Sequence, residues 1–107
     1  MRIIARATLR RFVDSLSTSK DRPAVKGALD AWFAEANKAN WKSMADVKRR
    51  YVTASIVNAE RVVFNIKGND YRLVVAMDFQ KAIIWIKWIG THKAYDKIDV
   101  TKVRHDS

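Results

Sequence analysis

Apolar side chains recur every three or four positions near the start of the chain. Leu9, Phe12, Val13 and Leu16 follow this spacing, with arginines between them. Side chains three or four positions apart lie on the same side of a helix, so the spacing indicates one apolar stripe that faces a core. It predicts a first helix over about 5–17.

Two more helices are expected after the first. Pro23 suits the first turn of a helix, where its missing N–H costs nothing, and this second helix should run to about 38–40. Its apolar face is predicted to consist of Val25, Leu29, Trp32, Phe33 and Ala36. Ser43 and Asp46 have the spacing of a capping box, in which each side chain accepts from the other's backbone N–H. They predict a short third helix over about 43–50.

The spacing changes in the second half, where β-branched and aromatic residues dominate. Short polar segments divide this half into three stronger strands, over about 61–67, 71–78 and 82–89. Connections this short join antiparallel neighbours. We therefore predict an α+β fold in which N-terminal helices pack on one face of a small antiparallel β-sheet. The 107 residues suit one core, so we expect a single domain over 1–107.

Alternation along a strand sorts its side chains between the two faces of the sheet. Apolar residues of the first strong strand share one face: Val62, Phe64 and Ile66. The polar residues between them belong to the opposite, open face: Arg61, Asn65 and Lys67. Arg72 follows in the next strand, after a turn in which Gly68 and Asn69 suit positive φ. We expect Asn65, Lys67 and Arg72 to cluster at the turn end of the open face.

The charge balance predicts a polyanionic partner. Lys and Arg number 21 against 11 Asp and Glu, a net charge of +10, and such a field attracts phosphates. Nucleic acid is the leading candidate, while a merely basic surface and an acidic protein partner remain open alternatives. Trp32, Phe33 and Trp41 could stack on bases, but their helical spacing is more typical of a core.

Composition also excludes several classes of site. The chain contains no cysteine, which excludes disulfides and zinc–thiolate sites and fits a reducing compartment. The longest apolar stretch, AIIWIKWIG, is interrupted by Lys87 and reaches about half of the roughly 20 residues that a membrane helix needs. The arginine-rich N-terminus does not resemble a signal peptide. We therefore expect a cytoplasmic protein that does not bind a membrane, with a frayed tail over 101–107 in which His105 is exposed.

Candidate chemistry follows the third strand, in the segment GTHKAYDKID. His92 and Tyr95 share a face if residues 92–97 form a helical turn, and the meander would bring both over Arg72. Together a histidine, a tyrosine and an arginine provide what RNA cleavage needs: groups that move protons and a cation that stabilises the charge on phosphorus-bound oxygens. His92 could instead be a structural histidine. His92 and Asp96 could in principle bind a metal, but no third ligand stands nearby, and we expect neither metal nor cofactor.

Two motifs in this half resemble the HigB-type toxin family of bacterial type II toxin–antitoxin modules. The first, F-N-x-x-G-N-x-x-R, is present as Phe64-Asn65, Gly68-Asn69 and Arg72. The second, G-T-H-x-x-Y-D, is present as Gly90-Thr91-His92 and Tyr95-Asp96. The stretch ANWKSMADVK at 39–48 is also similar to the family, and the resemblance covers roughly residues 4–100.

The resemblance implies a RelE-like fold and a ribonuclease that cleaves mRNA on the ribosome. It also implies a cognate HigA-like antitoxin with a helix-turn-helix domain, through which alone the complex contacts operator DNA. His92, Tyr95 and Arg72 would then be the catalytic residues. The residues expected to bind RNA are Asn65, Lys67, Asn69, Arg61 and Lys97. The wider fold also includes toxins that inhibit a topoisomerase, and a non-catalytic nucleic-acid-binding protein is the other alternative.

Overall fold

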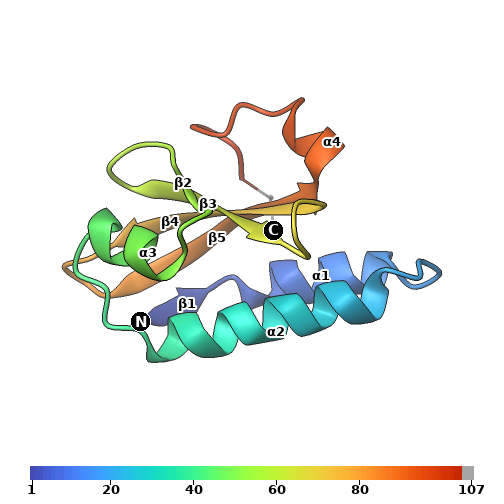
Figure 1. Cartoon of the computed structure of the whole chain (residues 1–107), viewed down its shortest axis with the longest axis horizontal. Helices are drawn as coiled ribbons and strands as arrows, with labels where there is room; N and C mark the ends of the chain where they lie inside the picture. The colour runs from blue at the N-terminus through green and yellow to red at the C-terminus, as the bar shows by residue number, and fades with distance from the viewer. Residues whose placement is uncertain (105–107) are drawn as a thin grey trace.

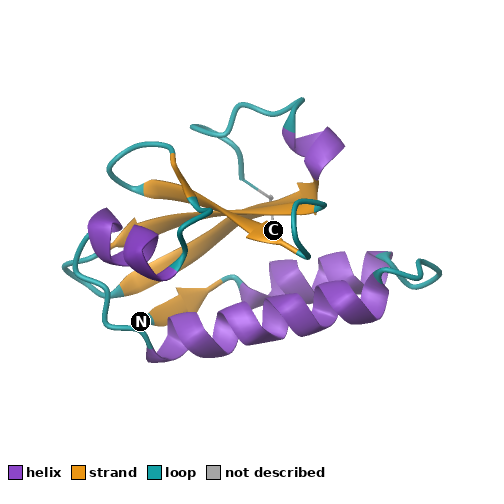
Figure 2. Cartoon of the chain, in the orientation of Figure 1, coloured by secondary structure: helices purple, strands orange, loops and turns teal. Residues whose placement is uncertain are grey.

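Two helices lie side by side beneath a sheet in the computed structural model, which describes residues 1–104 (Figure 1). They are α1, Arg6–Ser15, and α2, Arg22–Lys38, and a shorter α3, Met44–Arg50, follows them. These bounds confirm the three helices predicted from apolar spacing. The layers confirm the α+β class, with α1 and α2 covering one face of the sheet (Figure 2).

The sheet has five strands in the order β1-β5-β4-β3-β2. Their bounds are Arg2–Ile4, Ser55–Ile56, Arg61–Ile66, Tyr71–Asp78 and Ile83–Thr91, from β1 to β5. The predicted meander is confirmed as β3, β4 and β5, which pair antiparallel. The parallel strand β1, beside β5, was not predicted from the sequence. It is three residues long and is held by a partner far along the chain, so no local pattern marks it.

The main core lies between the helices and the lower face of the sheet. The expected apolar residues of β3 are buried there, and Trp32 and Trp41 are only 3% and 8% exposed. Phe33 packs against the same core while the Arg6 guanidinium lies 4.1 Å from the centre of its ring. The interpretation of these three aromatic residues as core is confirmed.

The upper face of the sheet is not fully open, contrary to the prediction. The segment after β5 folds back over it, and α4, His92–Tyr95, begins this return (Figure 1). Apolar side chains of the segment and of the loop before β3 pack on the middle of the face: Val57, Tyr95, Ile98, Val100 and Val103. Arg61 holds the segment down, because its Nη1 donates to the carbonyl oxygens of Val100 and Val103 at 3.0 and 2.7 Å.

These contacts correct the expectation of a frayed tail. Thr101–Arg104 are described, and the backbone N–H groups of Lys102 and Val103 donate to the carbonyl oxygen of Asp99 at 3.1 and 2.9 Å. The sequence pattern missed this segment because its apolar residues follow neither helical nor strand spacing. His105 lies outside the described residues.

A β-bulge between Val74 and Val75 changes the register of β5. Val74 pairs with Trp88, whereas Val75 pairs with Ile86, so Lys87 is the extra residue. A bulge interrupts alternation, and it turns the Trp88 ring onto the upper face.

The cap of α3 agrees in part with the predicted capping box. Ser43 Oγ accepts from the Asp46 N–H at 3.3 Å, as expected. The Asp46 carboxylate accepts instead from the N–H of Lys42, at 2.9 Å.

Over the described residues, no helix has the length and apolar character needed to cross a bilayer.

Candidate active site

The turn between β3 and β4 organises the predicted site. Lys67 and Gly68 have φ of 52° and 63°, so positive φ falls one residue earlier than predicted. The change ends the strand alternation at Ile66 and directs Lys67 away from the upper face. Lys67 and Asn65 were expected to share that face, and this expectation is wrong.

The Arg72 guanidinium is fixed by this turn. Its Nη1 donates to the backbone oxygen of Asn69 at 2.8 Å, and its Nη2 donates to Asn69 Oδ1 at 2.9 Å. The guanidinium carbon also lies 6.0 Å from the centre of the Tyr95 ring, at the limit of a cation–π contact. The predicted approach of Tyr95 to Arg72 is therefore confirmed.

Tyr95 in turn rests on Trp88. Their ring centres are 6.3 Å apart, and both residues belong to the apolar cluster of the upper face. Gly90, which pairs with Arg72 across the ladder, makes room for this arrangement. A Cβ at Gly90 would stand 2.4 Å from Trp88 Cη2, which is closer than any real contact. Gly90 thus allows the Trp88 ring to support Tyr95.

His92 is positioned through its backbone. Its N–H donates to the carbonyl oxygen of Asp70 at 2.9 Å, which ties the start of α4 to the β3–β4 turn. Thr91 caps α4, with its Oγ1 accepting from the Ala94 N–H at 3.1 Å. The His92 side chain is 48% exposed, and its Nε2 lies 3.6 Å from Asp96 Oδ2. Within residues 1–104 its ring makes no hydrogen bond or ion pair with Arg72, and its placement over Arg72 stays a prediction.

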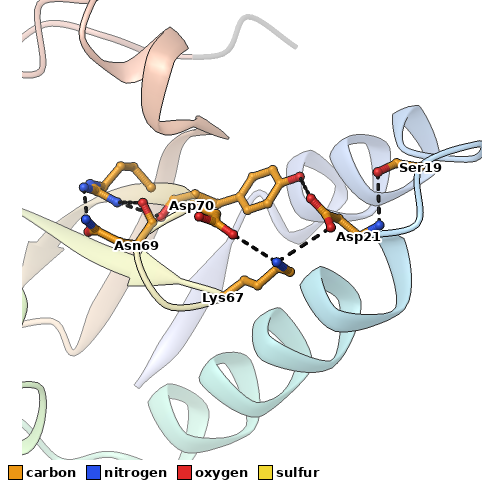
Figure 3. A network of polar contacts seen from close by, with 7 residues as sticks. Ser19, Asp21, Lys67, Asn69 and Asp70 are labelled. Atoms are coloured by element: carbon orange, nitrogen blue, oxygen red, sulfur yellow. Dashed lines mark hydrogen bonds and ion pairs between the residues drawn. The ribbon is translucent and has the colours of Figure 1, made fainter.

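A polar network joins the same turn to the helical layer (Figure 3). Lys67 Nζ donates to Asp70 Oδ2 at 2.9 Å and lies 3.7 Å from Asp21 Oδ1, before α2. Tyr71 donates to Asp21 at 3.0 Å, and the Asp21 N–H donates to Ser19 Oγ at 3.1 Å. The hydrogen bond to Asp70, followed by the charge of Asp21, raises the pKa of Lys67. Burial, followed by the hydrogen bond to Asp21, raises the pKa of Tyr71.

The other predicted RNA-binding residues lie at different distances from this site. Asn65 is paired with Arg72 across the β3–β4 ladder, and Lys97 is exposed after α4. Arg61 pairs with Ala76, at the opposite end of β3, where it holds the C-terminal segment. The structure therefore brings Asn65, Asn69 and Arg72 together, and it separates Arg61 from them.

Sequence reasoning missed Asp70, Thr91 and Trp88 as parts of the site. A threonine directly before a predicted helical turn is a cap signal that could have identified Thr91. Asp70 holds His92 through its carbonyl oxygen, and Trp88 reaches the upper face through a bulge, so no side-chain pattern marks either of these two contacts. Among the described residues, no three His, Asp or Glu side chains stand close enough to hold a metal ion.

A comparison with family models decides the family. The model of the HigB toxin, described as the RelE-like toxic component of a toxin–antitoxin system, matches residues 25–98. The chain belongs to the HigB toxin family. This HigB-family protein is therefore a toxin of a toxin–antitoxin system, and an antitoxin is its partner. The matched span contains the whole of the β3–β4 turn, β5 and α4. Among curated proteins, none matches the sequence significantly.

Substitution of Gly90 in this HigB-family toxin tests the support of Tyr95. We expect Gly90→Ala to lower the free energy of unfolding by about 1–3 kcal/mol, because the added Cβ forces the buried Trp88 ring to move. Thermal unfolding measures the loss. Gly27→Ala is the matched control, since nothing lies within 4 Å of its added Cβ, and there we expect a gain of about 0.5–1 kcal/mol. Equal stability of Gly90→Ala and wild type would show that the close contact is harmless.

Substitution of Lys67 separates two roles for its ammonium group. If Lys67 only positions the turn, Lys67→Met should leave the salt dependence of any RNA binding unchanged. If Lys67 instead contacts a phosphate, the slope of log K against log salt should fall by about 1. We expect the first result, because Asp70 and Asp21 already hold the ammonium. Lys97→Met, at an exposed position, is the comparison expected to change the slope.

Proposed function

We propose that this toxin is a ribosome-dependent, metal-independent endoribonuclease that cleaves translated mRNA and thereby inhibits translation and growth. The observation that supports the proposal most directly is the placement of Arg72 against Tyr95. His92 begins the same short helix and is tied to the same turn. A fixed cation and two groups able to transfer protons therefore lie at one end of the sheet.

The proposed reaction uses the 2′-hydroxyl of the RNA as its nucleophile. The 2′-oxygen loses its proton and bonds to the adjacent phosphorus, while the bond from phosphorus to the 5′-oxygen breaks and that oxygen gains a proton. His92 and Tyr95 carry out the two proton transfers. Arg72 stabilises the negative charge on the remaining phosphate oxygens, and its double hydrogen bond to Asn69 keeps it in place. The product carries a 2′,3′-cyclic phosphate, which water can open to a 3′-phosphate.

The path of the RNA is proposed from the polar residues around Arg72. Asn65 lies beside Arg72 on β3, and the exposed Lys93 and Lys97 stand on and after α4. Arg61 lies under the C-terminal segment and donates to it, so Arg61 would contact RNA only if the RNA extended past that segment. No carboxylate base lies against Arg72 among the described residues, so we propose that the ribosome aligns the substrate.

The antitoxin is proposed to be HigA-like, with a helix-turn-helix domain that alone contacts operator DNA. Its binding would keep the toxin from the ribosome in the cytoplasm of the host. The basic surface of the free toxin, with a net charge of +10, supports the need for such masking.

A reconstituted translation system tests the proposal. Primer extension on a defined mRNA, with and without ribosomes and with EDTA in a parallel arm, maps any cleavage. With EDTA confined to the ribosome-free arm, we expect cuts only in the lanes that contain ribosomes. Intact mRNA in every lane, from a folded protein, would contradict the ribonuclease proposal. A DNA damage response with intact mRNA would then indicate topoisomerase inhibition, and salt-sensitive binding without product would indicate a non-catalytic protein.

A further inference from the structure

A groove lies where α2 and α3 meet the outer edge of β3. It encloses about 300 Å³ and is lined by residues from all three elements: Ala28, Ala31, Trp32, Glu35, Arg50, Tyr51, Asn65, Ile66 and Lys67. A separate hollow lies beside His92. It is lined by His92 together with Asp21, Asn69, Asp70, Tyr71, Thr91 and Lys93. The residues proposed to transfer protons do not line the groove.

The edge of β3 along this groove has no neighbouring strand. The short β2 pairs only with Val62 and Val63, and β3 continues beyond it to Ile66. The carbonyl oxygen of Glu60 accepts a hydrogen bond from β4, whereas the carbonyl oxygen of Arg61 accepts hydrogen bonds from the opposite side of β3. Backbone groups of successive strand residues point in opposite directions. By this alternation the N–H and C=O of Asn65 point outward, into the position that another strand would occupy.

Two further features mark this side of the molecule. Trp32, which lines the groove, is 3% exposed, and its Nε1 is a buried donor with no acceptor among the described residues. A buried N–H without an acceptor is costly, so the packing around the Trp32 ring is under-stabilised. The large apolar side chains that are most exposed in residues 1–104 are Val52, at 71%, and Ile56, at 42%. Both follow α3, on the side of the sheet that ends in β2.

The charges around the groove indicate the kind of partner. Lys48, Arg49 and Arg50 form the last turn of α3. Glu35 is the carboxylate in the groove, and it already accepts hydrogen bonds from both Arg50 and Tyr51. Burial, followed by Glu35, raises the pKa of Tyr51, so its hydroxyl remains a donor. An acidic segment complements this rim, whereas a second copy of a chain with charge +10 is repelled.

We propose that an extended, acidic segment of the antitoxin docks in this groove and adds a strand to the edge of β3. Backbone hydrogen bonds to Asn65 would position it, and side chains entering the groove beside Trp32 would provide specificity. The inference rests on the antitoxin-controlled function proposed above, but it does not depend on the ribonuclease chemistry.

The test uses the toxin and the antitoxin encoded beside it, purified as a complex and then separated. Ala31 is exposed on α2 and lines the groove, so Ala31→Glu introduces a like charge without disturbing the core. We expect its Kd for the antitoxin to rise at least about tenfold. Ala34→Glu, on an exposed position of α2 outside the groove, should change the Kd less than about twofold. An unchanged Kd for Ala31→Glu, in a variant with wild-type Tm, would overturn the proposal.

Hydrogen exchange on the wild-type complex gives a second measurement that needs no variant. The Asn65 amide should exchange rapidly in the free toxin and at least tenfold more slowly in the complex. The Phe64 amide, which points toward β4, is the internal control and should be protected in both. Equal exchange of the Asn65 amide in the free toxin and in the complex would count against strand addition. Protection of the same amide in a toxin dimer without antitoxin would also count against it. Both readouts measure binding, so a toxin that cuts no RNA can still pass them, and an active ribonuclease can still fail.

Discussion

Replacement of His92 by alanine is expected to reduce ribosome-dependent mRNA cleavage by at least about a hundredfold, the usual contribution of a proton-transferring group. The fold should be unaffected, because the side chain is 48% exposed and its ionic contact is with the exposed Asp96. His92 is held by its backbone N–H, which alanine retains. Growth arrest on expression without antitoxin should therefore disappear while the Tm stays within about one degree of wild type.

The experiment on His92 needs a control on the same helix. Lys93→Ala changes the next residue of α4, which is exposed and is proposed at most to attract RNA. It should retain cleavage within a few-fold, with a change in salt dependence rather than in rate at saturation. If folded His92→Ala arrests growth as strongly as wild type, His92 has no catalytic role. Loss of arrest in both variants would instead point to a docking surface.

Replacement of Arg72 by lysine is expected to reduce cleavage by about 10²–10³-fold, similar to the loss of one donor to a developing oxyanion. Lysine keeps the charge but cannot make the pair of hydrogen bonds by which Asn69 fixes the guanidinium. The loss should therefore appear in kcat more than in KM. Single-turnover cleavage on preformed ribosome–mRNA complexes separates the two.

Arg10→Lys provides the comparison for Arg72→Lys. Arg10 is exposed on α1, in the layer opposite to α4, and its replacement preserves the charge in the same way. We expect no change in either parameter. A rate for Arg72→Lys close to wild type would mean that charge alone, and not its orientation, is required.

Most of the fold was predictable because local periodicity determines it. The stripe of Leu9 and Val13 predicts α1, and the alternation around Phe64 predicts β3, and both are where they were expected. The parallel strand β1 was not predictable, since its three residues acquire their structure only beside β5. The return of the C-terminal segment over the sheet depends on Arg61 and two carbonyl oxygens, which leave no trace in the apolar pattern.

The site was predictable to a similar degree. A three-strand meander brings the end of β5 near the start of β4, and this explains why Tyr95 was correctly placed beside Arg72. The direction of Lys67 was missed because a single positive φ, which most residues avoid, removes it from the strand. The position of the His92 ring over Arg72 stays a prediction, since strand pairing locates the start of α4 but not the rotation of the side chain that begins it.

The pairing of β1 with β5 also affects when a newly made chain can fold. The first residues of the chain must wait for residues 83–85 before their strand has a partner. Arg72 and the residues of α4 are likewise joined only through contacts across β4 and β5. Contacts between segments so distant in sequence form late, because a long loop must close first. During synthesis, therefore, the emerging polypeptide cannot complete this end of the sheet until its last strand has left the exit tunnel.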